Sequence, residues 1–459
     1  MQQGDPLGPL LFSLVLHPLA LKIKAEFADL DLCVWYLDDG TIIGQMDDVY
    51  NVFLLLEREG PALGLHLNVK KNEIWWPSRA TTDPFPAEVD RIDNAGVKLL
   101  GAPIGTTTFT TEFVRKKLDA LEIVCKALQD VDNAQVEFAL FRGCLSYNKI
   151  NHLLRTCPPD LLGDALELFD EHFQNMVAEI LRQPCLTGDQ WDQASLPVKM
   201  AGLGVNQTKV IAASAYVGSC TLTKELVAAL LGVDAAEFEP SRVAALLSAH
   251  EVATGKVHTL SSLCGEKSVQ QKLSTERHMA MFEHLKVHSV ARAHNLLLAC
   301  SMPHASDWLI APPIPGLGLG LQSEVFRTAL KFRLGVPLFD APFSCPSLDS
   351  DGKACGSQMD VFGDHAPCCH HGPALVFRHN NVRDILVHAA RGAGLSAVVK
   401  AFTLFHWRGK LEARLRRCMR RSASGLSWRV LVVATRHIIF AATCTRRSLA
   451  VFRGTWHRL

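Results

Sequence analysis

The sequence predicts an α+β protein with a split βαβ unit first, a mainly helical region after it, and a small Cys/His cluster. Three observations support this class. Two β-prone runs meet at Asp38 and Asp39, which is the pattern of a β-hairpin. Apolar residues recur at helical spacing through much of residues 106–340. Cysteine and histidine residues gather between residues 345 and 369, and these residue types bind Zn²⁺.

The hairpin sequence, residues 32–44 (LCVWYLDDGTIIG), carries the first candidate site. An Asp-Gly pair between apolar runs is a strong hairpin signal, so turn geometry alone is one explanation of Asp38 and Asp39. A second explanation is that the hairpin tip presents two adjacent carboxylates to a hard cation such as Mg²⁺, as in metal-assisted nucleotidyl transfer. The flanking segments favour the second explanation.

The segments around the hairpin predict the rest of the βαβ unit. Residues 2–12 (QQGDPLGPLLF) place a glycine turn before an apolar helix, and Pro9 suits the first turn of that helix. Residues 47–63 have helical periodicity, and residues 65–76 are strand-like. Strand, helix and strand in this order predict a split βαβ fold. Residues 99–105 (LLGAPIG) predict a further hairpin.

These motifs together resemble the reverse transcriptases of non-LTR retrotransposons, which are RNA-directed DNA polymerases. In that family QGDPLSPLLF lies behind the templating base pair, YxDD is the metal-binding hairpin, and GLxLNxxKTE carries a lysine near the incoming triphosphate. The resemblance implies Mg²⁺ as a cofactor, an RNA template, a DNA primer and a dNTP as partners, and a YLDD hairpin in a partial palm domain. It implies catalytic roles for Asp38, Asp39 (both Mg²⁺ ligands) and Lys71, and substrate contacts for Gln3, Gly4 and Tyr36.

The resemblance also divides the chain into segments. LLGAPIG looks like the primer grip of the family, and the LPxxxxGLG sequence from Leu196 to Gly204 resembles its post-thumb region. Lys70 is a local alternative to Lys71. We expect a partial palm at 1–105, a helical thumb at 106–157, a helical connector at 158–340, a zinc module at 341–400 and a basic tail at 401–459.

The candidate zinc ligands are spaced Cys345-x9-Cys355-x9-His365-x3-Cys369. Tetrahedral Zn²⁺ takes four such thiolate and imidazole ligands. Because the spacing has no tight Cys-x-x-Cys pair, unconnected cysteines and surface histidines are the alternative. The resembling family carries a CCHC cluster at this place, and residues 363–369 (GDHAPCC) look like its GDHALSC segment, so the resemblance implies Zn²⁺. The glycines of residues 315–320 (PGLGLG) do not predict a dinucleotide site, because no strand precedes them.

Charge is distributed unevenly along the chain. Residues 401–459 hold 12 Arg, one Lys and one Glu, a net charge of +12, so residues 1–400 carry −11 because the whole chain carries +1. The arginines of residues 408–421 alternate with apolar residues at helical spacing, which predicts a basic amphipathic helix. A nucleic-acid or nuclear-import patch, a membrane-surface helix and translation of a shifted frame are the competing explanations. After Asp384 the one acidic residue is Glu412, so the family's endonuclease domain is not expected.

Cysteine usage and hydropathy predict the compartment. The chain has 14 cysteines without the spacing of a small disulfide-rich domain, so we expect reduced thiols and an intracellular location, in the nucleus or cytoplasm. The apolar run from Leu10 to Leu16 has no basic segment before it, which disfavours a secretory signal. We find no stretch of about 18 apolar residues, so we expect no membrane partner. The oligomeric state stays open.

Two-metal nucleotidyl transfer requires a third carboxylate besides the pair in the hairpin. The chain begins at Met1, directly on the glycine segment, so we expect the fingers and the first catalytic aspartate to be missing and the chain to be inactive alone. The first hypothesis is therefore a reverse transcriptase fragment. The second is a noncatalytic nucleic-acid-binding protein that uses the zinc cluster and the basic tail. The third is a degenerate product without a selected function.

Overall fold

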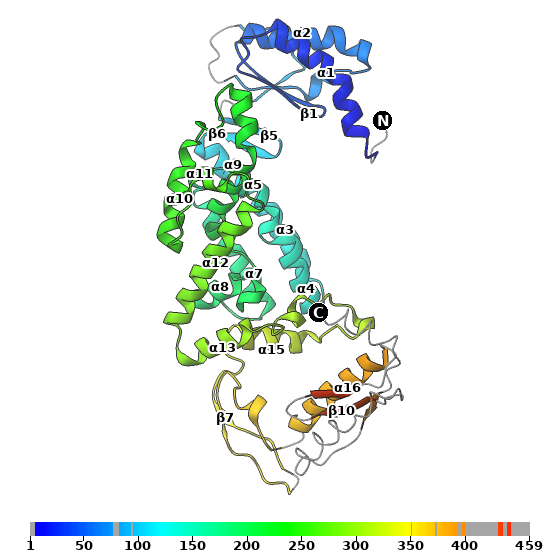
Figure 1. Ribbon diagram of the computed structural model, residues 1–459, viewed down its shortest axis with the longest axis vertical. Coiled ribbons are helices and arrows are strands. Elements are labelled where there is room, and N and C mark those ends of the chain that lie inside the picture. The colour runs from blue at the N-terminus through cyan, green and yellow to red at the C-terminus, as the bar shows by residue number, and fades with distance from the viewer. Residues whose placement is uncertain are drawn as a thin grey trace, which may run out of the picture. The chain divides into compact units, whose positions relative to one another are not determined.

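The structure is a computed structural model that divides into two compact units, Met1–Val336 and Pro337–Leu459 (Figure 1). Each unit is described by itself. The described residues are 5–76, 82–92, 95–349, 351–371, 374–392, 397–399, 430–434 and 438–441. Gln3, Gly4 and the predicted basic helix of residues 408–421 lie outside the described residues.

The first unit begins with two helices packed beside a β-hairpin. Apolar side chains of the first helix, among them Leu19 and Ile23, form a core with Val52 and Leu55 of the second. Lys22 joins the two helices by an ion pair with Glu59, with 2.6 Å between Nζ and Oε1. The elements are α1 (Gly8–Glu26), β1 (Leu32–Tyr36), β2 (Asp39–Ile43) and α2 (Met46–Glu59). The hairpin predicted at residues 32–44 and the helix that follows it are therefore confirmed.

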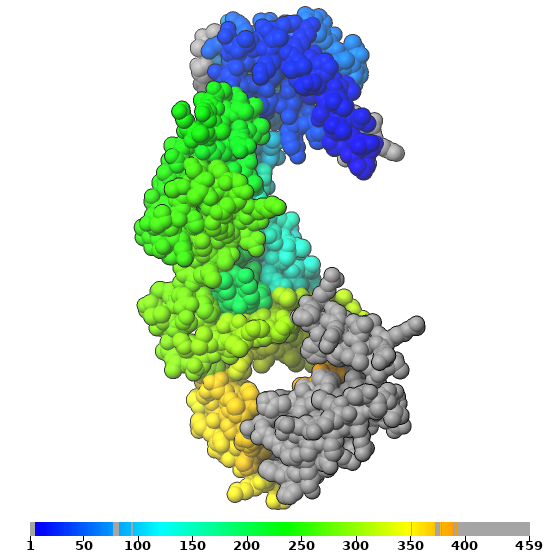
Figure 2. All heavy atoms as spheres, viewed as in Figure 1, coloured from blue at the N-terminus to red at the C-terminus, as the bar shows by residue number. Residues whose placement is uncertain are grey.

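Helix α1 presents much of its apolar surface to solvent. Leu10 and Leu14 are each 58% exposed, and Figure 2 shows the beginning of this helix, in deep blue, at the surface. By length and composition α1 could cross a membrane, which corrects the expectation that no stretch of the sequence is long and apolar enough. Its other face is buried, as in the core helix of a folded domain, with Leu16 6% and Ile23 0% exposed.

The strand expected over residues 65–76 is wrong for most of its length. Two 3₁₀ turns, η1 (Gly60–Leu63) and η2 (Val69–Lys71), flank an irregular segment, and only Glu73–Ile74 (β3) is a strand. Strand β3 pairs in parallel with β4 (Asp90–Arg91) and not with the hairpin, so the described residues hold no continuous sheet of hairpin and third strand. Asn68, which is turn-prone, precedes the 3₁₀ turn, and Lys71 donates its backbone N–H to the Asn68 carbonyl.

The hairpin expected at residues 99–105 is present as β5 (Gly96–Leu99) and β6 (Ala102–Gly105). Its two-residue turn has positive φ at both positions, 46° at Leu100 and 84° at Gly101. This is the mirror-image turn that matches the twist of antiparallel strands. Glycine is suited to the second position because it lacks a Cβ, whereas Leu100 adopts an unfavourable left-handed conformation.

A bundle of helices makes up the rest of the first unit and holds its largest core. Phe138, Phe169, Phe173 and Phe326 are fully buried there, and the rings of Phe138 and Phe326 lie 5.9 Å apart between centroids. The helices predicted from apolar spacing in this region are present. In order the elements are α3 (Thr107–Gln129), α4 (Ala134–Leu140), η3 (Phe141–Leu145), η4 (Tyr147–Lys149), α5 (Asn151–Thr156), α6 (Pro159–Leu162), α7 (Ala165–Ile180), α8 (Gly188–Ser195), η5 (Val198–Met200), α9 (Thr208–Leu231), α10 (Ser241–Thr254), α11 (Leu260–Leu263), α12 (Val269–His288), α13 (Ala291–Ser301), α14 (Asp307–Ile310), η6 (Pro315–Leu317) and α15 (Ser323–Arg333).

A buried arginine holds the LPxxxxGLG segment in place. Arg333, 3% exposed, donates from Nη2 to the carbonyl oxygens of Val198 (2.9 Å) and Gly202 (3.1 Å) and to Ser306 Oγ (2.8 Å). Gly202 fits only because it has no side chain, since a Cβ there would lie 1.9 Å from the Leu196 carbonyl oxygen. The end of α15 is thereby tied to the loop between α8 and α9.

The second unit carries the candidate zinc residues on a short β-hairpin and the loop after it. Two-residue strands β7 (Phe343–Ser344) and β8 (Gln358–Met359) pair antiparallel. The remaining described elements are η7 (Ala366–Cys368), α16 (Ala374–Gly392), β9 (Ala397–Val399), β10 (Val430–Ala434) and β11 (Ile438–Ala441). Strand β10 lies between β9 and β11 in a three-stranded sheet.

Replacing Arg333 by lysine should lower the free energy of unfolding by about 2–4 kcal/mol. Lysine cannot reproduce the planar fork of donors, so buried carbonyl oxygens would lose their partners. Urea denaturation followed by circular dichroism measures the change. Arg182→Lys is the control, because Arg182 pairs with Glu324 at the surface and should matter by less than about 0.5 kcal/mol. Equal losses in the two variants would contradict the role given to Arg333.

Candidate active-site hairpin and metal centre

The turn of the β1–β2 hairpin lies two residues earlier than the Asp39-Gly40 signal implies. Tyr36 pairs with Asp39, so Leu37 and Asp38 form the two-residue turn and Asp39 begins the second strand. Leu37 has a φ of 57°, a left-handed conformation that costs a branched side chain of this size about 1–3 kcal/mol. Gly40 is explained by packing, because a Cβ there would lie 2.4 Å from the ring of Trp35 on the opposite strand.

The hairpin exposes the residues to which a catalytic role was given. Tyr36 is 65% exposed, and the side chains of Asp38 and Asp39 are exposed at and beside the tip. Neither carboxylate has a hydrogen bond or ion pair with another described residue. On the inner side, Cys33 and Trp35 pack on the α1–α2 core. The core therefore anchors the hairpin on one side and leaves the two adjacent carboxylates exposed on the other.

The structure does not complete the magnesium site within the described part of the chain. No third His, Cys, Asp or Glu ligand atom there lies close enough to Asp38 and Asp39 to form a three-ligand group. Two carboxylates suit a hard cation, but the two-metal reaction requires a further bridging acid. The expectation that Gly4, Asp38, Asp39 and Lys71 surround one cleft stays a prediction, because Gly4 is not described.

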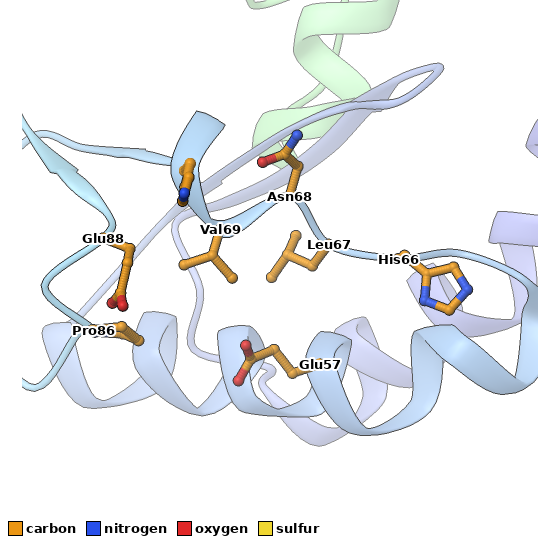
Figure 3. Close-up of a pocket in the computed structure, with 8 residues that line it drawn as sticks. Glu57, His66, Leu67, Asn68, Val69, Pro86 and Glu88 are labelled. Atoms are coloured by element: carbon orange, nitrogen blue, oxygen red, sulfur yellow. The ribbon is translucent and has the colours of Figure 1, made fainter.

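A pocket does lie beside the predicted lysine motif. Lys70, the alternative to Lys71, lines it, whereas Lys71 is exposed and does not. In Figure 3, Glu57 on α2 faces the segment that carries Leu67 and Val69. His66, Asn68, Pro86 and Glu88 complete its wall. The pocket offers polar groups of both charges at its rim, and neither Asp38 nor Asp39 lines it.

The four predicted zinc ligands converge in the second unit. The ligand atoms of Cys345, Cys355, His365 and Cys369 all lie within 4.8 Å of one another. The Cys345 and Cys369 Sγ atoms are 3.8 Å apart, too far for a disulfide, and Cys355 Sγ lies 3.4 Å from His365 Nε2. A tetrahedral zinc ion with ordinary bond lengths separates two sulfur ligands by about 3.8 Å and a sulfur and a nitrogen by about 3.6 Å. The arrangement therefore has the dimensions of a tetrahedral zinc site.

Backbone hydrogen bonds position the ligands. Cys345 donates its N–H to the Ser357 carbonyl and Cys355 donates to the Ser347 carbonyl, each at 2.8 Å, so one hairpin aligns both thiols. The loop that follows is held by Asp360, whose Oδ1 accepts the backbone N–H groups of Phe362 (3.1 Å) and Asp364 (3.0 Å). These contacts bring His365 and Cys369 to the hairpin.

The electrostatics of the cluster favour two thiolates. Hydrogen bonds from Ser347 lower the pKa of the Cys345 thiol, and hydrogen bonds from Ser357 lower that of Cys355. Burial raises the pKa of Cys369. The neighbouring Cys368 is exposed and is not one of the four converging residues.

A second converging group was missed by sequence reasoning. His250, His258 and Glu276 bring their ligand atoms within 4.8 Å of one another in the first unit. They lie eight and eighteen residues apart in the sequence, on two helices and a loop, and such spacing matches no local metal motif. Predicting this group requires knowing that the end of α10 packs beside α12, and the sequence does not contain that information.

Comparison with known proteins gives one relationship. No family model matches the sequence. Over 216 residues the chain is 26% identical to the "Retrotransposable element SLACS 132 kDa protein" of Trypanosoma brucei gambiense. The chain is similar to a retrotransposon protein. The match covers 47% of this chain and 18% of that protein, so the chain spans less than a fifth of the relative. The similarity supports a retrotransposon-derived protein.

Zinc bound by the Cys/His cluster should fall by about one equivalent in Cys355→Ser, because one of four tetrahedral ligands is lost. Elemental analysis of the purified full chain measures the loss, and chelation should unfold the residues around the cluster. Cys368→Ser is the matched control and should keep its zinc. A chain without zinc, or zinc content equal in the two variants, would remove the assignment.

Proposed function

We propose that the protein is part of a retroelement reverse transcriptase, whose family reaction is RNA-templated DNA synthesis by nucleotidyl transfer. The observation that carries the proposal is the hairpin, which exposes Asp38 at its tip and Asp39 beside it, next to an exposed Tyr36 and without an ion pair to any residue that the structure describes. The similarity to a retrotransposon protein supports it. RNA template, DNA primer and dNTP are the partners that this function requires.

Asp38 and Asp39 are the residues that would hold Mg²⁺. The cation, when bound, neutralises charge that develops on the transferred phosphoryl group. Carboxylate oxygens are the ligands that Mg²⁺ prefers, and exposure leaves room for the waters and phosphate oxygens that complete its shell. Lys71, exposed on η2, is the proposed counter-charge for the triphosphate, and Lys70 is its alternative.

A second candidate function is favoured by the Cys/His cluster. A zinc ion with four protein ligands stabilises the fold of a small module. Such a site has no open position for a substrate, so it serves a structural role and not a catalytic one. The protein would then bind nucleic acid through this module and the basic tail of residues 401–459. Zn²⁺ is proposed as a structural ion in either case.

The DNA sequence immediately upstream of the Met1 codon tests the first function against the second. Translated in frame, a segment with a strand that ends in aspartate would supply the third carboxylate of the reaction. A protein extended by that segment should then extend a primer on an RNA template with Mg²⁺. The lack of any such reading frame would favour the noncatalytic function or a degenerate product.

Residues 1–459 alone should show no primer extension, because two carboxylates cannot hold both cations of the reaction. In the extended protein Asp38→Asn should reduce incorporation by at least about 100-fold, as expected for loss of a transition-state electrostatic contact. Asp29→Asn, which removes an exposed carboxylate before β1, is the control and should retain activity. Incorporation that survives Asp38→Asn would overturn the assignment of Asp38.

The tail should strengthen nonspecific binding of RNA and DNA. Its net charge of +12 releases counterions from the phosphate backbone, so affinity should fall steeply as salt rises. Salt-titrated binding of the full chain is compared with that of residues 1–400, which should bind more weakly and with a shallower salt dependence. Equal affinity and equal slope would mean that the tail contributes nothing and that binding comes from the zinc module or the helices.

A further inference from the structure

Three side chains from separate elements meet in the first unit and belong neither to the hairpin nor to the Cys/His cluster. His250 lies in the last turns of α10, His258 in the loop before α11, and Glu276 in the middle of α12. The Nε2 atoms of the two histidines lie 2.9 and 2.8 Å from the same oxygen, Oε2 of Glu276. Two imidazoles and a carboxylate therefore point at one place.

The surroundings hold this geometry tightly. Gly255, with a φ of 68°, ends α10 and turns the chain toward His258. Thr259 follows at once and caps α11 with a reciprocal pair of hydrogen bonds to Ser262. Beneath the group lies a small apolar core that includes Leu247 of α10 and Leu273 of α12, each one helical turn before a ligand residue. The three side chains are thus placed by packed elements and not by a free loop.

Burial and charge suit a cation. The side chains of His250, His258 and Glu276 are 6%, 11% and 16% exposed, so water competes poorly with them. Both imidazole Nε2 atoms lie within hydrogen-bond distance of one carboxylate oxygen of Glu276, so the three groups face one another at short range. The group combines one anionic ligand with two imidazoles, the set used by zinc sites with an open fourth position.

We propose that His250, His258 and Glu276 form a binding site for a zinc-class transition-metal ion that ties α10 and the loop after it to α12. The required movement is small. In a tetrahedral zinc site a nitrogen and an oxygen ligand lie about 3.3 Å apart, so each imidazole would move from the carboxylate oxygen by about 0.5 Å. A water molecule takes the fourth position. Imidazole and carboxylate ligands suit Zn²⁺, Ni²⁺ and Cu²⁺ better than Mg²⁺ or Ca²⁺.

The alternative is a hydrogen-bonded group in which both histidines donate to Glu276 without any metal. The two cases differ in what zinc does. A zinc ion that joins ligand residues eight and eighteen positions apart stabilises the folded state by an amount that rises with the logarithm of the free zinc concentration above the dissociation constant, whereas a hydrogen-bonded group does not respond to zinc.

The test uses the full chain carrying Cys355→Ser, so that the Cys/His cluster does not mask the result. Equilibrium dialysis against Zn²⁺ followed by elemental analysis should show one equivalent bound. Adding Glu276→Gln, which keeps the shape of the side chain and its ability to accept a hydrogen bond, should weaken binding by at least about 10–100-fold, the loss that changes in the outer shell of a metal site already cause. His304→Gln is the matched control, because His304 pairs with a single carboxylate, Asp307, at 2.9 Å and should keep the zinc.

Two further measurements make the outcome independent of any one variant. Zinc should raise the melting temperature of the Cys355→Ser chain, and EDTA should reverse the rise. Co²⁺ in the same chain should give visible ligand-field bands without the near-ultraviolet thiolate band that a cysteine site produces. No bound zinc in the Cys355→Ser chain, zinc unaffected by Glu276→Gln, or a cobalt spectrum with thiolate absorption would each overturn the proposal.

Discussion

The buried guanidinium of Arg333 is the constraint on which the helical part of the first unit depends. A buried cation without a carboxylate partner is costly, and here burial also lowers the pKa of Arg333. The charge is tolerated because the guanidinium donates hydrogen bonds to the carbonyl oxygens of Val198 and Gly202 and to the hydroxyl oxygen of Ser306. The same contacts tie the LPxxxxGLG loop to the end of α15. That loop joins α8 to the buried start of α9, so the helices on both sides take their places from it.

Much of the architecture follows from local chemistry that can be read in the sequence. The two hairpins were predictable because Asp38, Asp39 and Gly40 in one and Gly101 in the other interrupt apolar, strand-like runs, although the first turn lies at Leu37 and Asp38 and not at Asp39-Gly40. Residues 65–76 were misjudged because the alternation of Leu65, Leu67 and Val69 resembles a strand, while a turn-prone asparagine breaks it into a 3₁₀ turn. Strand pairing depends on partners far along the chain, and local pattern does not contain that information.

Of the two groups of possible metal ligands, one could be predicted from the sequence and the other could not. The convergence of Cys345, Cys355, His365 and Cys369 was predictable because cysteine and histidine are the residues that zinc selects, and their gathering within 25 residues limited the choice. His250, His258 and Glu276 could not be predicted, since nothing in their sequence spacing sets them apart from histidines and glutamates on a solvated helix. Their meeting is a product of the packing of α10 against α12.

The hairpin and the Cys/His cluster differ in how many possible metal ligands the described structure brings together. In the cluster four possible ligands from one hairpin and the loop after it already lie within 4.8 Å of one another, so the fold itself brings the donor atoms together. The hairpin holds two carboxylates beside a strained Leu37, and strain of this kind persists only where packing imposes it. Here the α1–α2 core supplies that packing through Cys33 and Trp35. The strain therefore lies at the exposed tip, next to Asp38, which is the carboxylate that the proposed function requires to stay accessible.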